Sequence, residues 1–97
     1  MSDFTFSHDQ QGHRYVAKDF AGELAGEINY RELDANLVAI DHTGTEPNFR
    51  GQGLASRLTK FALDDLRARG IKVVPICPFT ADFLQQNSDY ADLRHSA

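Results

Sequence analysis

The chain has 97 residues, of which 41% are hydrophobic and 10% aromatic, and this length predicts one domain spanning residues 1–97. Its 14 acidic and 10 basic residues give a formal charge of −4, which argues against a nucleic-acid partner because a polyanion would be repelled. No apolar run approaches the roughly eighteen residues that a bilayer span needs, so we expect no membrane partner.

A β-hairpin is predicted at the start of the chain. Phe4 and Phe6 alternate with polar neighbours, and the turn-forming segment 9–12 separates them from a second apolar run. The pattern predicts strands over residues 3–8 and 13–18.

Two further strands and a loop follow. Over residues 23–31 apolar and polar side chains alternate, which predicts a half-buried strand. The segment from residue 37 to about residue 43 is apolar on both faces at its start, so we place it near the middle of the sheet. Glycine and proline in residues 44–53 predict a loop.

The spacing of apolar residues changes after Gly53. Side chains three or four positions apart predict an amphipathic helix that ends near Arg69-Gly70. A short strand is predicted over residues 71–74, a second helix begins near Pro78 or Thr80, and a last short helix covers about residues 89–93.

These elements predict an α/β (α+β) fold. It contains a mixed sheet of about five strands, mostly antiparallel, with one long helix and one or two short C-terminal helices. The strand, loop, helix and strand over residues 37–74 form a crossover, and a crossover favours one parallel pairing in the sheet.

A glycine-rich turn, Arg50-x-x-Gly53-x-Ala55, stands between a strand and the predicted long helix. The first amides of a helix have no partner inside the helix, and the positive end of the helix dipole favours an anion there. Glycine before a helix is also ordinary in loops, but the preceding strand and Arg50 favour a phosphate site. The turn is neither a Walker loop nor a Rossmann fingerprint.

Arg50, Gly53 and Ala55 match the Gln/Arg-x-x-Gly-x-Gly/Ala motif, through which the chain resembles the GNAT (GCN5-related) N-acetyltransferase superfamily. His42-Thr43 and Val73-Val74-Pro75-Ile76-Cys77-Pro78-Phe79 resemble segments of its minimal-length branch of small N-acetyltransferase-domain proteins. The resemblance covers residues 36–94 closely and the first 35 residues only in strand pattern.

The resemblance implies a GNAT-like fold that binds acetyl-CoA or CoA as co-substrate. The turn amides would hold the pyrophosphate, and the pantetheine arm would run along residues 41–45. The implied cofactor-binding residues are Thr43, Gly44, Thr45, Phe49, Arg50, Gly51, Gln52, Gly53, Leu54, Ala55, Pro78 and Phe79. The implied activity is transfer of acetyl to an amine that the sequence does not identify. A non-catalytic acyl-CoA-binding or sensor module and a small interaction module without CoA binding stay open as alternatives.

Two positions depart from the resembled pattern. Gly44 stands where relatives often carry a glutamate, and Ser88 stands where a proline is common. If that glutamate is a general base, Glu46 would have to replace it here. The minimal branch also lacks the N-terminal helices that shape the acceptor pocket in longer members, so the acceptor site is expected to be open or completed by a partner.

Cys77 and His42 are the candidate catalytic residues. Cys77 precedes a predicted helix, whose N-terminus favours a reactive thiolate, although free cysteine is more often a small buried hydrophobe. His42 continues the apolar face of Val38 and Ile40 and is expected either to line the cleft as a proton acceptor or to be a structural histidine. A Cys77/His42 pair on neighbouring strands would form an activated thiol.

The remaining polar candidates have simpler interpretations. Tyr90 could be a general acid, but packing of the last helix onto the body is the favoured role. His8, His13 and His95 lack metal-ligand spacing to Cys77, so we predict no metal. Residues 1–4 lack a signal-peptide profile, and the single cysteine excludes an internal disulfide, so we expect a cytoplasmic protein.

Overall fold

The computed structural model describes residues 4–95. It contains one mixed sheet in which the five strands lie in the order β1-β2-β3-β4-β5. The first three pairings are antiparallel, and β4 pairs with β5 in parallel, so the predicted sheet with one crossover is confirmed. Asp3, the first residue of the predicted strand 3–8, lies outside the described residues. The strands are β1 (Thr5–Asp9), β2 (Arg14–Lys18), β3 (Leu24–Asp34), β4 (Leu37–Thr45) and β5 (Lys72–Pro75).

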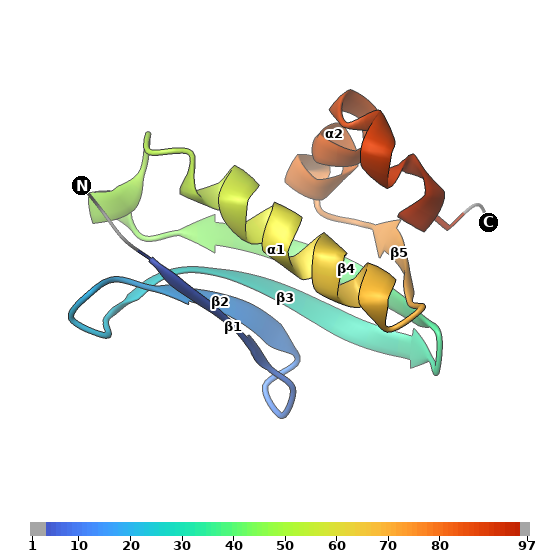
Figure 1. Cartoon of the computed structure of the whole chain (residues 1–97), viewed down its shortest axis with the longest axis horizontal. Coiled ribbons are helices and arrows are strands. Elements are labelled where there is room, and N and C mark those ends of the chain that lie inside the picture. Colours follow the sequence, from blue (N-terminus) through green and yellow to red (C-terminus); the bar gives the residue numbers. More distant parts are fainter. Residues whose placement is uncertain (1–3, 96–97) are drawn as a thin grey trace.

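The long helix α1 (Leu54–Ala68) lies across one face of the sheet, and α2 (Pro78–Gln86) follows β5 on the same side of the molecule (Figure 1). Two short 3-10 helices, η1 (Pro47–Phe49) and η2 (Ser88–Leu93), precede α1 and follow α2. The apolar stripe of α1 packs on the sheet as its spacing predicts, because side chains three and four apart share one face of a helix. The buried stripe and its main partners are Leu54, Leu58, Ala62, Leu63 and Leu66 from α1 with Tyr15, Ala17, Ile28, Val38, Ile40 and Val73 from the strands.

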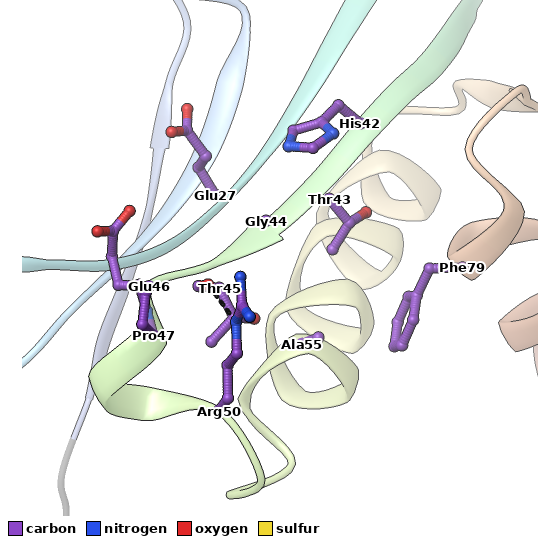
Figure 2. A pocket seen from close by; sticks show the side chains of 10 residues that line it. All are labelled: Glu27, His42, Thr43, Gly44, Thr45, Glu46, Pro47, Arg50, Ala55 and Phe79. Atoms are coloured by element: carbon purple, nitrogen blue, oxygen red, sulfur yellow. Dashed lines mark hydrogen bonds between the residues drawn. The ribbon is translucent and has the colours of Figure 1, made fainter.

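A β-bulge changes which side chains of β4 face the helix. Tyr30 pairs with Ile40, but the preceding residue of β3, Asn29, pairs with His42, so Asp41 has no residue opposite it. An extra residue reverses the in-out alternation beyond it. His42 is therefore exposed on the open face (Figure 2), paired with Asn29, and the prediction that it continues the face of Val38 and Ile40 is wrong.

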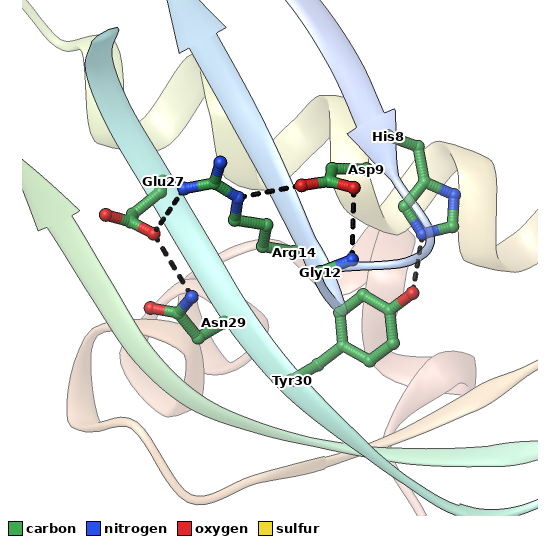
Figure 3. A network of polar contacts seen from close by, with 7 residues as sticks. All are labelled: His8, Asp9, Gly12, Arg14, Glu27, Asn29 and Tyr30. Carbon is green, nitrogen blue, oxygen red and sulfur yellow. Dashed lines mark hydrogen bonds and ion pairs between the residues drawn. The ribbon is translucent and has the colours of Figure 1, made fainter.

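His8 is a part-buried histidine between the sheet and α1. Its ring stacks on Tyr15 at 4.1 Å between centroids, and its Nε2 is hydrogen-bonded to the Tyr30 hydroxyl at 2.6 Å (Figure 3). Nδ1 lies 3.4 Å from Oδ2 of Asp65 without hydrogen-bond geometry. Burial lowers the pKa of His8 below its ordinary value, and the Asp65 carboxylate only partly offsets this effect.

We expect the free energy of unfolding to fall as the pH drops from about 6.5 toward the lower pKa of folded His8. In this window the unfolded chain binds a proton that the folded chain does not, so acid favours unfolding; the full stability is present above the window. Denaturation at about pH 7.5 and about pH 5.5 measures the loss. His8→Gln has no titrating ring and should lose less. An equal loss in His8→Gln would contradict this assignment.

Candidate functional site

A cavity of about 530 Å³ lies where β4 ends and α1 begins (Figure 2). Its lining comes from β3, from the end of β4, from the following loop and from the first residues of α1 and α2. The lining residues are Glu27, His42, Thr43, Gly44, Thr45, Glu46, Pro47, Arg50, Ala55 and Phe79. The strand end and two residues of the glycine-rich turn, Arg50 and Ala55, therefore face one cavity.

The start of α1 is built by two glycines. Gly51 and Gly53 have φ of 82° and 72°, in the left-handed region that favours glycine, and a Cβ on either would meet no atom within 4 Å. Gly53 is the N-cap and makes no side-chain cap hydrogen bond, and the first turn contains no acidic residue. The first intrahelical bond runs from the Arg57 amide to the Gly53 carbonyl at 3.2 Å. The amides of residues 54–56 precede it and are suited to an anion.

The other residues of the predicted turn differ in what they can offer a ligand. Arg50 is exposed, and its Nε donates to the Thr45 carbonyl at 3.4 Å. The Phe49 ring packs edge-on against Phe4, with centroids 5.6 Å apart. Leu54 is 1% exposed, so only its main chain could meet a ligand.

Gln52 and Gly51 lie at the exposed tip of the turn, outside the set of lining residues. Pro78, also exposed, begins α2 and lies outside that set as well. Phe79 follows it, is 38% exposed, and lines the cavity.

Gly44 makes room for the ring of His42. A Cβ at position 44 would lie 3.0 Å from Nε2 of His42, tighter than side chains normally pack. The imidazole thus occupies the space above Gly44 where a larger side chain would begin. This is the position at which the resembled proteins often carry a glutamate, so the exposed polar group here is a histidine from two residues earlier.

Cys77 is 6% exposed and caps α2, outside the set of residues that line the cavity. Its sulfur donates to Oγ1 of Thr43 at 3.6 Å. Burial raises the pKa of the thiol, but the thiolate could accept hydrogen bonds from the Thr80 amide and from the Thr43 hydroxyl, and these outweigh burial and leave the pKa below its ordinary value. Thr43 faces α1 whereas His42 lies on the opposite face, so the fold does not bring Cys77 and His42 together as an activated pair.

Tyr90 is 8% exposed and donates its hydroxyl to Asp64 at 2.7 Å. It therefore packs η2 onto α1, as the favoured interpretation of the sequence predicts.

Glu27 is a cavity residue that sequence analysis missed. It stands on the open face of β3 directly opposite Gly44 of β4. Its Oε1 accepts from Asn29 Nδ2 at 3.1 Å and from Arg14 Nη1 at 3.3 Å (Figure 3). The alternation of β3 placed Glu27 on the polar face, but only the register of two strands places it beside Gly44.

The model of the family described as GCN5-related N-acetyl-transferase matches residues 14–93. The chain belongs to this family. The chain is similar to a GCN5-like N-acetyltransferase candidate from Staphylococcus aureus, whose solution structure is known. The two sequences are 27% identical, the TM-score is 0.75, and the match covers 100% of this chain and 93% of that one. The resemblance to the GNAT superfamily and the fold class predicted from the sequence are thereby confirmed.

Longer members of the family match in part. The GNAT family N-acetyltransferase YhbS from Escherichia coli, solved in complex with CoA, is 29% identical, with a TM-score of 0.58 over 64% of this chain and 38% of that one. A GNAT family acetyltransferase from Elizabethkingia anophelis with acetyl-CoA bound shares the fold at 21% identity, with a TM-score of 0.58 over 75% of this chain and 50% of that one. Comparison with curated proteins finds no match.

Within residues 4–95 of this GCN5-related N-acetyltransferase domain, no group of three or more His, Cys, Asp or Glu side chains is placed to hold a metal ion. The same part of the chain contains no helix that is both long and apolar enough to cross a membrane.

Proposed function

We propose that this chain binds acetyl-CoA, or CoA, with the diphosphate on the main-chain amides at the start of α1, and transfers the acetyl group to an amine. The observation that carries this proposal is the left-handed N-cap Gly53, which precedes α1 without a side-chain cap and stands two residues before the cavity residue Ala55. Amides and the helix dipole act together on an anion at such a site.

The charges around the cavity support this orientation of the coenzyme. Arg50 lines the part of the cavity that is near the start of α1, where it would face the diphosphate. The pantetheine arm would then follow residues 41–45 of β4 toward Thr43 and Phe79. The CoA and acetyl-CoA in the structures of the two longer family members are consistent with this choice of co-substrate.

In the proposed reaction the amine nitrogen attacks the carbonyl carbon of the thioester. A C–N bond forms, the C–S bond breaks, and CoA leaves as its thiolate. The proton released by the amine passes to His42, which is exposed on the open face above Gly44. Most of the acceleration would come from holding the amine and the thioester together and from polarising the carbonyl.

A second candidate is a non-catalytic acyl-CoA-binding or sensor module. It is favoured by the open face of the sheet, because neither α1 nor α2 covers that side of β3 and β4 (Figure 1). In the described part of the chain, no helix would enclose an acceptor on this face, and a protein that only binds acyl-CoA needs no such enclosure.

Release of CoA from acetyl-CoA in the presence of a broad panel of amines separates the two functions. Turnover with any amine supports acetyl transfer. Binding of acetyl-CoA without turnover across the panel favours the sensor, and failure to bind acetyl-CoA overturns both.

Cys77→Ala is expected to leave the affinity for acetyl-CoA and the rate of acetyl transfer within about threefold of the wild type. We propose that the thiol takes no part in the transfer, because its sulfur is buried, hydrogen-bonded to the Thr43 hydroxyl, and outside the set of residues that line the cavity. Titration calorimetry and the CoA-release assay measure the two quantities. A loss of more than about 100-fold in rate, with an acetylated Cys77 trapped in the wild type, would show a covalent route instead.

A further inference from the structure

The charged residues of the cavity are separated by sign. Arg50 and the start of α1 provide positive charge on one side of β4 (Figure 2). Glu27 stands on the other side, near His42, and Glu46 follows the end of β4. If the anionic coenzyme lies on the positive side, the acidic side is left for the second substrate.

Glu27 is the more firmly placed of the two carboxylates. Its side chain is 28% exposed, and the bonds from Asn29 and Arg14 both end on Oε1 (Figure 3). Among the described residues, the hydrogen bonds and the ion pair of Glu27 use Oε1, which leaves Oε2 for a ligand. A carboxylate held in this way has already lost most of its side-chain freedom, so binding costs less.

Arg14 does not neutralise this side of the cavity. Its guanidinium is shared between Glu27 and Asp9, to which Nε donates at 3.0 Å. Two carboxylates and one guanidinium leave one net negative charge. That charge lies on the open face directly opposite Gly44, which has no side chain of its own, and the exposed ring of His42 is the neighbouring side chain from β4.

We propose that Glu27 binds the acceptor as an ammonium ion and holds its nitrogen beside His42. The inference rests on the proposed function and adds a specificity residue: the acceptor enters over the open face of the sheet and carries a positive charge. A carboxylate with Oε2 directed at the ligand favours an ammonium group over a neutral group of the same size. The bound ammonium must lose one proton before it attacks, and His42, which is exposed, can pass this first proton to water and then accept the second proton released during the attack.

The probe for this site is butylamine, with butanol as its neutral counterpart of the same chain length. Titration of butylamine into the whole chain, followed by amide resonances, should shift residues 27–29 and 42–44, and butanol should not. Glu27→Gln keeps an oxygen for Asn29 and Arg14 but removes the charge, and should weaken butylamine binding about tenfold. Glu32→Gln removes the same charge from the far end of β3, outside the cavity, and should leave binding unchanged.

The inference is overturned if butylamine shifts none of these amides, if butanol shifts them equally, or if Glu27→Gln binds butylamine as tightly as the wild type. Where the amine is turned over, Glu27→Gln should raise its KM about tenfold and change kcat less than about threefold, a split that a purely structural defect would not give. Acetyl-CoA is titrated into a separate sample of each variant. Missing shifts at residues 53–56 would refute the proposed coenzyme site, whatever the result with butylamine.

Discussion

Gly53→Val is expected to weaken acetyl-CoA binding by on the order of 100-fold. Valine strongly disfavours the φ of 72° at this position, so the turn must change and the first amides of α1 will point elsewhere. The space around position 53 is open, so the side chain itself would not disrupt the core. Titration calorimetry measures the affinity, and circular dichroism checks that the fold is retained.

Gly70→Val is the matched control for this variant. Gly70 follows the other end of α1 with the same φ of 72° and equally open surroundings, so both variants carry a similar backbone strain of about 1–3 kcal/mol. Gly70→Val should therefore lose similar stability but keep its affinity. Equal loss of affinity in the two variants would mean that strain, and not the anion site, explains the result for Gly53.

Leu54→Ala is expected to lower the free energy of unfolding by about 2–5 kcal/mol. This loss is large for a domain whose total stability is about 5–15 kcal/mol. Leu54 is 1% exposed and anchors the first turn of α1, and a Cβ added to Gly26 on β3 would lie 3.5 Å from its Cδ2. Removing this anchor loosens the amides that precede the first intrahelical bond, so acetyl-CoA binding should weaken about tenfold as well. Urea denaturation and titration calorimetry measure the two effects.

Leu66→Ala separates stability from the site. Leu66 is equally buried but lies near the other end of α1. Its truncation should cost a similar free energy of unfolding and leave the affinity of the folded protein within about twofold. If Leu66→Ala weakens binding as much as Leu54→Ala, the start of α1 has no special part in holding the coenzyme.

Much of the fold could be predicted because local patterns determine it. The helix predicted to follow Gly53 and to end near Arg69-Gly70 is observed as Leu54–Ala68, and β5 pairs with β4 in parallel as the crossover predicts. Periodicity and glycine punctuation are properties of neighbouring residues and can be read from one chain. The turn that precedes α1 was located for the same reason.

The faces of the site could not be predicted because they depend on pairing between strands. Nothing about an aspartate at position 41 indicates a bulge in the sequence. The bulge nevertheless turns His42 away from the helix and turns Thr43 toward it. Glu27 becomes a cavity residue only through its register with Gly44, 17 positions later in the chain. The activated Cys77/His42 pair fails on this same reversal, since alternation counted along one strand does not include an extra residue.

The central claim is that the unpaired amides at the start of α1 hold the diphosphate of the coenzyme. Titration of acetyl-CoA into the isotopically labelled protein, with every backbone amide followed by NMR, tests it most directly. The largest shifts should fall on residues 53–56, with smaller ones along residues 42–45 and none of similar size at the far end of α1. Saturable binding that leaves residues 53–56 unshifted, or no binding at all, would contradict it.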